Sequence, residues 1–409
     1  MVAVAAEPDD VGAAAVSVSV REYDGDRDLG AVERLEKECE VGPSGGKKMC
    51  LFTDLLGDPL CRVRHSPAYL MLVAETTSEN EEEIVGVVRG SVKTVSCGKQ
   101  QVFCKVAYLL GLRVSPAYRR RGIGRKLVQR MEEWFRTAGA EYAYVATDAD
   151  NEASVRLFTS PRCGGYAKFR TPSLLVHPVF RHHDITPSRR TRIIKLSPKE
   201  AETLYRIKFA GVEFFPTDID AVLNNNLSLG TFLAVPAAMN WVGIEAFLAM
   251  AGEPSSSWAV ASVWNSKDAF RLQLRGAPAL WRAAALATRA ADAAAPWLRV
   301  PSVPDIFSAP FGVHFLYGLA GAGPAAPSLT RALCRHAHNL ARRCGARVVV
   351  TEVAAGDNIR AGVPHWPRLG AEDLWCVKRL ADGYDSASAL GDWTKAPPGD
   401  SIFVDPREF

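Results

Sequence analysis

The sequence predicts a mixed α/β protein that contains two domains. Its 409 residues are too many for one hydrophobic core of ordinary size. Segments with strand-like spacing alternate with segments of helical spacing, which is typical of a mixed sheet covered by helices. A strand–helix–strand series in the first half also recurs in the second half. With 48% hydrophobic and 23% charged residues, the composition is that of a soluble globular chain.

The first elements are expected after a small-residue, acidic leader over residues 1–15, which is expected to be disordered. Val16, Val18 and Val20 alternate with polar residues, so we expect a half-buried strand there. Asp28 is the predicted N-cap of a helix. The apolar face of that helix consists of Leu29, Val32, Leu35 and Cys39. Three further strands are expected over residues 69–75, 84–95 and 105–114.

A basic, glycine-containing turn separates the third of these strands from an amphipathic helix. The apolar face of this helix carries Leu127, Val128, Met131, Trp134 and Phe135. Gly139 is expected to end the helix, and residues 142–147 predict a strand. Asn151 is the predicted cap of a short helix that contains Phe158. The chain then returns to a strand over residues 166–176.

Composition divides the rest of the chain. Residues 181–195 contain a proline and five basic residues, which favours a linker over a nuclear-import signal. The most apolar stretch, residues 231–252, is expected to be a buried helix and not a membrane span, because it contains Pro236, Asn240 and Glu245. The predicted boundaries are a leader over 1–15, a first domain over 16–180, a linker over 181–195, a second domain over 196–380 and a C-terminal tail over 381–409.

An internal repeat relates the two halves at an offset of 206 or 207 residues. The matched pairs are Leu110-Gly111-Leu112 with Tyr317-Gly318-Leu319, Gly139 with Gly345, Asp150-Asn151 with Asp357-Asn358, and Gly164 with Gly370. The second half is therefore expected to be a degenerate copy of the first. The copies differ at one place, where the second copy lacks the basic, glycine-containing turn. There, Ala326-Pro327-Ser328-Leu329-Thr330-Arg331 stands in place of Arg119-Arg120-Arg121-Gly122-Ile123-Gly124. We expect one cofactor site, in the first copy.

The turn over residues 119–124 has the features of a pyrophosphate site. Its N–H groups and the following helix N-terminus attract an anion, glycine permits close approach, and arginine adds charge-assisted hydrogen bonds. A solvated basic loop is the structural alternative. The dinucleotide-binding fingerprint fails, because Leu127 stands where the third glycine is required. A P-loop fails at residues 42–49, where no Ser or Thr follows the lysines.

Several classes of protein are disfavoured. The net charge of +4 is too small to argue for direct nucleic-acid binding. The nine cysteines form no C-x-x-C pair, so neither a metal site nor a disulfide framework is expected. No basic residue precedes Arg21, which is wrong for a signal or transit peptide. We expect a nuclear or cytoplasmic protein that is not secreted and not in a membrane.

Residues 112–124, from Leu112 to Gly124, resemble motif A of the GCN5-related N-acetyltransferase (GNAT) superfamily, and the stretches around Asn151–Phe158 and Gly164–Tyr166 resemble its motif B. The two-copy layout and the run over residues 224–231 resemble the plant Hookless family of N-acetyltransferases, which implies a nuclear role in hormone-dependent growth.

The resemblance implies that Leu112, Arg113 and Val114 pair with the pantetheine of acetyl-CoA. It also implies that the pyrophosphate is held by Arg119, Arg120, Arg121, Gly122, Ile123 and Gly124. The adenosine 3′-phosphate would lie near Arg125 and Lys126. Asn151 and Phe158 would line the cofactor channel.

The catalytic positions depart from the family pattern. Histone-acetylating relatives place a base Glu where this chain has Tyr108, and a general-acid Tyr where it has Phe158. An amine with a pKa of about 10.4 still needs a base or a water relay. Glu75 and Asp148, each at a strand end, are candidate bases, and Tyr108 is either a proton donor to the leaving thiolate or a core residue. In the second half, His365 comes seven residues after Asn358 and is expected to serve structure or substrate docking, whereas Glu352 follows the repeated strand and receives no role.

The sequence therefore predicts an acetyl-CoA-dependent N-acetyltransferase. A protein lysine, with histone tails among the candidates, is the expected acceptor. A small-amine acetyltransferase is an alternative that would need a closed, carboxylate-lined pocket between the copies. A non-catalytic acyl-CoA-binding regulator is another, favoured by the missing Glu and Tyr.

Overall fold

The computed structural model of the chain is a mixed α/β protein, as the sequence predicts. It describes residues 17–39, 50–77, 82–97, 102–161, 164–179, 184–186, 188–253, 256–298, 302–354, 357–367, 369–381, 392–395 and 401–409. The predicted leader over residues 1–15, the stretch 42–49 and Arg181 lie outside the described residues.

A 13-stranded mixed sheet runs through both halves of the described chain. Its strands are β1 (Ser17–Glu22), β3 (Ala68–Thr77), β4 (Glu82–Cys97), β5 (Val102–Val114), β6 (Tyr142–Asp148), β7 (Ala167–Arg170), β8 (Ser173–Pro178), β9 (Thr191–Leu196), β10 (Ser228–Pro236), β11 (Trp258–Trp264), β13 (Val313–Ala322), β14 (Val348–Val353) and β15 (Ala371–Arg379). The order is β1-β3-β4-β5-β6-β15-β8-β14-β13-β11-β10-β9, with β7 on β15. Among the strand pairs that the structure describes, only β5–β6 and β13–β14 are parallel. A separate sheet joins β2 (Cys50–Asp54) to β12 (Arg271–Arg275).

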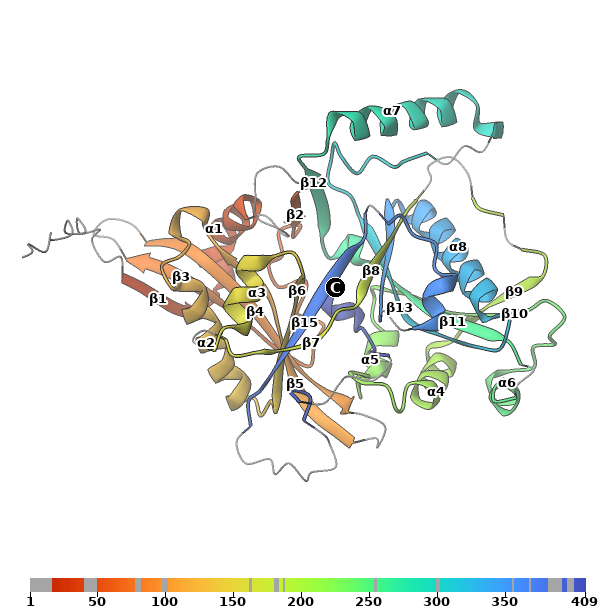
Figure 1. Cartoon of the computed structure of the whole chain (residues 1–409), viewed down its shortest axis with the longest axis horizontal. Helices are drawn as coiled ribbons and strands as arrows, with labels where there is room; N and C mark the ends of the chain where they lie inside the picture. Colours follow the sequence, from red (N-terminus) through yellow and green to blue (C-terminus); the bar gives the residue numbers. More distant parts are fainter. Residues whose placement is uncertain are drawn as a thin grey trace, which may run out of the picture.

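The helices lie on both faces of the sheet, apart from one, α7, which stands away from it at the top of the view (Figure 1). They are α1 (Gly25–Glu38), α2 (Ile123–Thr137), α3 (Glu152–Thr159), α4 (Pro198–Lys208), α5 (Ile219–Leu223), α6 (Ile244–Met250), α7 (Ala279–Ala294) and α8 (Ala326–Cys344). In the first half, α2 buries Leu127, Met131 and Phe135 against the sheet. In the second half, α8 buries Leu329 and Leu333 in the same manner. The opposite face of both halves shares one large core.

The two halves are interlocked by an exchange of strands. β15, from the end of the chain, pairs with β6 of the first half from Asp373↔Asp148 to Arg379↔Tyr142. β8, from the first half, pairs with β14 of the second half along its whole length. Figure 1 shows β15 and β8 at the junction, with the C-terminus beside them. The halves therefore complete each other's sheets.

Residues 403–409, which the sequence places outside both domains, are largely buried at this junction. Asp405 is fully buried and forms ion pairs with Lys93 of β4 (3.1 Å) and Arg407 (2.7 Å). Arg407 also pairs with Asp218, just before α5 (2.6 Å). Burial alone would raise the pKa of Asp405, but the two cations beside it hold that pKa far below its usual range. This network ties the last residues to both halves.

Four expectations about individual elements are wrong. Asp24, not Asp28, caps α1, because the carboxylate of Asp28 is buried against Arg21 (2.6 Å). Residues 231–252 form the end of β10 and the short helix α6, not one helix. An unbroken apolar run fits a strand inside a covered sheet as well as a buried helix. The strand expected over 166–176 is two strands, β7 and β8, and residues 191–195 of the expected linker belong to β9.

Candidate functional site

The basic turn lies between β5 and α2, where the backbone leaves the ordinary allowed region. Gly122 is the N-cap of α2 with φ of +79°, a left-handed conformation that suits glycine. A Cβ atom at Gly122 would meet no atom within 4 Å, so the space above the helix N-terminus is open. Arg120 also has a positive φ, of +65°. A turn of this shape aims its N–H groups outward, toward a bound anion.

Four arginines surround this helix end: Arg119, Arg120, Arg121 and Arg125. All four are exposed, and none forms an ion pair with a carboxylate among the described residues. The Arg119 Nε donates a hydrogen bond to the Val114 carbonyl (3.2 Å), and the Arg121 guanidinium lies over the Tyr118 ring (5.2 Å). The first turn of α2 contains no acidic residue. The cations and the helix dipole therefore act together on an incoming anion.

Beside this turn, β5 and β6 separate. Their parallel pairing runs from Val106↔Tyr142 to Leu109↔Val145, yet both strands continue, to Val114 and Asp148. Gly111, with φ of +62°, produces a bulge at the point of separation. The backbone of Leu112, Arg113 and Val114 therefore has an edge that β6 does not use, which can pair with an extended ligand.

The two motif B residues have different environments. The Asn151 side chain accepts a hydrogen bond from the Ser154 N–H (3.2 Å) and caps α3, as predicted. Phe158 is 2% exposed and packs edge-on against Tyr166. Asn151 lies next to the end of β6, beside the opening, whereas Phe158 belongs to the core behind it.

Below the opening, a row of aromatic rings crosses the sheet. Tyr108 of β5 stacks on Tyr144 of β6 (ring centroids 4.8 Å apart), and Tyr144 stacks on Trp375 of β15 (5.4 Å). The Trp375 indole N–H donates a hydrogen bond to Glu352 of β14 (2.9 Å). Burial raises the pKa of Tyr108 above its ordinary value, and nearby Glu408 adds to the rise. The hydroxyl of Tyr108 therefore stays protonated at neutral pH.

Three acidic residues lie near the end of this row. Asp148 ends β6 directly opposite Asp373 of β15, and Glu352 lies on β14. Burial, together with Asp148, raises the pKa of Asp373 to about 6. Burial and the charge of Asp373 raise the pKa of Glu352 well above its ordinary range. Asp373 and Glu352 are both half-buried, so solvent still reaches them.

Comparison with known proteins identifies the family. Residues 33–164 match the model of the acetyltransferase (GNAT) family. The chain is 55% identical to "Probable N-acetyltransferase HLS1-like" of Arabidopsis thaliana, over 96% of this chain and 100% of that protein. It is 56% identical to "Probable N-acetyltransferase HLS1" of the same plant, over 95% and 99%. This chain belongs to the GNAT family of acetyltransferases. The resemblance inferred from the two motifs is thereby confirmed.

Further similarities extend along the whole chain. "Acetyl transferase GW6a" of Oryza sativa subsp. japonica is 44% identical over 96% of this chain and 98% of that protein. Among solved structures, N-myristoyltransferase of Saccharomyces cerevisiae with bound myristoyl-CoA has a TM-score of 0.53. It is 10% identical, over 91% of this chain and 84% of that chain, and shows a likeness of fold alone. The chain is an N-acetyltransferase of GNAT type, in a family that uses acyl-CoA.

In this acetyltransferase, the predicted catalytic residues do not all come together. Tyr108 and Asp148 lie on the neighbouring strands β5 and β6, beside the opening. Glu75 is on β3, where it pairs with Arg21 of β1 (2.5 Å) and Arg27 of α1 (2.9 Å). Its two arginines make Glu75 part of the contact between α1 and the sheet, away from the row of rings.

The second-half residues noted in the sequence also separate. Glu352 belongs to the aromatic row, whereas the His365 ring is hydrogen-bonded to the Val363 carbonyl (3.0 Å). Among the described residues, no three His, Cys, Asp or Glu side chains gather as metal ligands. No helix in the described part of the chain is long and apolar enough to cross a membrane.

Sequence reasoning missed two groups in the site. Asp373 carried no motif and could be found only through the pairing of β15 with β6. The second group is a buried ion network behind the bulge: Arg89 bonds Glu36 (2.8 Å) and the Pro59 carbonyl (2.6 Å), and its guanidinium lies against Gly111. The only signal for it was the pair of ionisable residues at expected core positions of α1 and β4.

Proposed function

We propose that this acetyltransferase transfers an acetyl group from acetyl-CoA to the side-chain amine of a protein lysine, with Arg119, Arg120, Arg121, Gly122, Ile123, Gly124 and Arg125 holding the phosphates. Two neighbouring features carry the proposal. The N-terminus of α2 is open and its arginines have no carboxylate partner among the described residues, and β5 separates from β6 beside it. A pyrophosphate suits the first feature, and an extended pantetheine suits the free edge of Leu112 to Val114.

The residues below the opening support a short acyl group. The rings of Tyr108, Tyr144 and Trp375 are stacked and fill the face of the sheet at that point. Tyr108 would donate its proton to the leaving thiolate, and an N–H near Leu112 would stabilise the oxyanion of the collapsing intermediate. Asn151 and Asp148 would flank the pantetheine from the β6 side.

The junction supports a protein acceptor. A small amine would need a closed, carboxylate-lined pocket between the halves, but residues 403–409 occupy that space. Their acids, Asp405 and Glu408, are already paired with Lys93. A lysine on a four-carbon arm can reach half-buried carboxylates from outside. Histone tails are rich in such lysines, and a histone acceptor would place the reaction in the nucleus, in a growth-regulatory role.

We further infer that the second half is a degenerate copy of the first. Both halves have a path of five strands with the same connections, β1-β3-β4-β5-β6 and β9-β10-β11-β13-β14, and an exchanged strand adds a sixth to each. Each path has one parallel pair and a left-handed glycine in the same strand, Gly111 or Gly318. On this proposal, the expected domains, 16–180 and 196–380, correspond to the two copies in chain order, except that β9 of the second copy begins at Thr191 and that β8 and β15 pair across the junction.

A transfer assay tests the function. Purified protein with labelled acetyl-CoA should acetylate lysines of histone-tail peptides, and should acetylate spermidine at least tenfold more slowly. Mass spectrometry locates the modified atoms. Transfer to spermidine alone would favour the small-amine enzyme, and tight binding of acetyl-CoA without transfer to any amine would favour the non-catalytic regulator.

A further inference from the structure

We propose that Glu352 and Asp373, two carboxyls that the second half contributes to the site of the first half, form an acid pair that receives the ammonium group of the acceptor and takes its proton. This inference rests on the proposed function and adds to it a base that sequence motifs do not indicate. Throughout, "acid pair" means these two residues.

Strand pairing brings the acid pair to the opening. Residues directly opposite each other in a sheet share a face, and alternate residues along a strand share it too. Asp373 is opposite Asp148, and Trp375 is opposite Ala146. Asp148 is three residues beyond the last β5–β6 pair, so Asp373 lies beside the separated strands. The bond from the Trp375 indole N–H fixes Glu352 next to the same row (2.9 Å).

The acid pair also shares its face with the predicted proton donor. Tyr108 pairs with Tyr144, and Tyr144, Ala146 and Asp148 alternate along β6. Both Glu352 and Asp373 contribute to the raised pKa of Tyr108, after burial, Glu408 and the opposing effect of Arg62. A base and an acid are therefore available on one side of the sheet, at the two ends of the aromatic row.

The acid pair lacks a cation, unlike the other buried acids of the junction. Asp405 and Glu408 are neutralised by Lys93, and Asp405 also by Arg407. Among the described residues, no Lys, Arg or His forms an ion pair with Glu352 or Asp373. The charge of Asp373 raises the pKa of Glu352, so the two carboxyls titrate as a pair and not independently. They are half-buried, so an ammonium group can reach them and supply the missing charge.

The proposed step balances in atoms and charge. An R–NH₃⁺ group gives one proton to the ionised carboxylate of the acid pair and becomes R–NH₂. The amine lone pair then forms the C–N bond with the thioester carbonyl carbon, and the C–S bond breaks. The thiolate takes a proton from Tyr108, which regains one from the amide nitrogen through solvent. The acid pair releases its proton to water, so one H⁺ is produced per acetyl group transferred.

Kinetics of three variants in the full chain test this step. Glu352→Gln and Asp373→Asn should each lower kcat for a lysine peptide about a hundredfold, the usual contribution of a general base. The affinity for acetyl-CoA should change less than twofold. Glu372→Gln is the matched control, because it removes the same charge from the same strand on the opposite face and its residue is exposed. If both variants keep more than half of the wild-type kcat, the acid pair is not the base.

The pH profile separates a base from a structural residue. In the wild type, kcat should rise with pH through an apparent pKa near 6, since Asp373 titrates there, and this limb should move in Asp373→Asn. The charge of Asp148 acts on Asp373 and that of Glu408 acts on Glu352, and the Tyr108 hydroxyl lies on the same face. The limb should be unchanged in Glu372→Gln. A limb that stays in place in Asp373→Asn would contradict the assignment.

Peptide binding keeps the inference testable if no amine is acetylated, an outcome that would reject the proposed function. Calorimetry with the lysine peptide and CoA-saturated protein should show binding at least tenfold weaker for Glu352→Gln and Asp373→Asn than for wild type and Glu372→Gln. Equal affinities, or a wild type that binds no peptide, would overturn the acid pair as the receptor of the ammonium group.

Discussion

The β5–α2–β6 unit of the first half and the β13–α8–β14 unit of the second half share a backbone design. Each first strand contains a left-handed glycine, Gly111 (φ +62°) or Gly318 (φ +60°). Each parallel pair holds for four residue pairs before the strands separate. In each, an amphipathic helix then covers the same relative face of the sheet. The strands and helices alone therefore do not distinguish the halves.

The turns before the two helices do distinguish them. Above Gly122 there is open space, and four exposed arginines surround it. At Gly323, before α8, a Cβ atom would lie 2.2 Å from the Ser256 carbonyl oxygen, so the chain itself fills that position. The first cation of α8 is Arg331, in its second turn. Loss of open space and loss of charge together remove an anion site while the fold remains.

The largest effect is expected from separating the halves. Residues 1–185 alone lack β15, which pairs with seven residues of β6, and they leave β8 without β14. An unpaired edge in the middle of a sheet and an uncovered core promote aggregation. We expect this fragment to be insoluble or markedly destabilised when expressed alone, as judged by sedimentation and circular dichroism.

Co-expression provides the control for this prediction. Residues 1–189 and 190–409, produced together, should copurify and recover binding of acetyl-CoA, because each supplies the strand that the other lacks. A soluble first half that is fully active by itself would show that the exchange of strands is not needed, and that the second half has no part in catalysis.

The next largest effect concerns the cationic turn. Replacing Arg119 and Arg121 by Ala should weaken acetyl-CoA binding by roughly 2–4 kcal/mol in total, since charge-assisted bonds contribute about 1.5–3 kcal/mol each and exposure reduces this. That corresponds to about 30- to 1,000-fold in Kd. Arg331→Ala on α8 is the matched control and should have no effect. Calorimetry should give one site per chain; two equivalent sites would contradict the difference between the turns.

The two left-handed glycines should differ in stability. In Gly318→Ala, the new Cβ would lie 2.4–2.8 Å from atoms of the buried Tyr205 ring, which is rigid. In Gly111→Ala it would lie 2.7 Å from the end of the longer Arg89 side chain. Strain at a positive φ adds about 1–2 kcal/mol in both. We expect Gly318→Ala to cost about 3 kcal/mol in unfolding free energy and Gly111→Ala less. If chemical denaturation shows equal losses of unfolding free energy in the two variants, the Arg89 side chain cannot move aside for the new Cβ.

The sequence predicted those parts of the fold that depend on local pattern. The helical spacing of Leu127, Met131 and Phe135, the Asn151 cap and the offset between the glycines all depend on nearby residues. Asp28 was wrong as a cap because Arg21, in another element, binds its carboxylate. Residues 231–252 were wrong because an apolar run does not show whether sheet or helix will cover it.

The site was predictable only where its residues are contiguous. The turn over residues 119–124 is a single stretch of chain, so the sequence motif alone predicted an anion site there. The aromatic row and the acid pair are assembled from β5, β6, β14 and β15 by strand exchange, and no local signal records which strands will pair. The sequence pattern thus located the residues expected to bind the cofactor better than the residues expected to carry out the chemistry.

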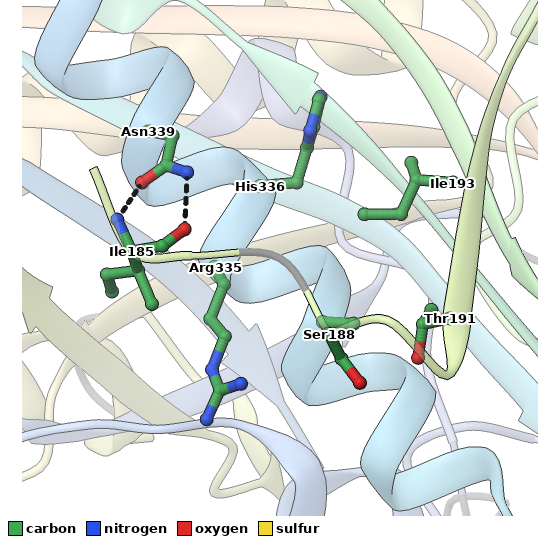
Figure 2. A pocket seen from close by; sticks show the side chains of 8 residues that line it. Ile185, Ser188, Thr191, Ile193, Arg335, His336 and Asn339 are labelled. Atoms are coloured by element: carbon green, nitrogen blue, oxygen red, sulfur yellow. Dashed lines mark hydrogen bonds between the residues drawn. The ribbon is translucent and has the colours of Figure 1, made fainter.

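The sequence also contained no sign of the small pocket between α8 and residues 185–186 and 188–193. In this pocket, the Asn339 side chain forms hydrogen bonds with both the N–H and the carbonyl of Ile185 (Figure 2).

The smallest structural change tests the chemistry of the first half most directly. Tyr108 corresponds to Phe315 at the repeat offset of 207, so Tyr108→Phe gives the first half the residue that the second half already has. The ring would keep its stack on Tyr144, and only a protonated hydroxyl would be lost. Unfolding free energy should change by less than about 1 kcal/mol, and acetyl-CoA affinity should stay within twofold.

If Tyr108 is the proton donor, turnover should fall by about tenfold or more, because the thiolate must then leave without general-acid help. Single-turnover kinetics with a lysine peptide would measure this step, with Tyr142→Phe as the control for loss of a buried tyrosine hydroxyl on the neighbouring strand β6. Full activity in the Tyr108 variant would assign its ring to the core alone, and the two halves would then differ in binding but not at this position in catalysis.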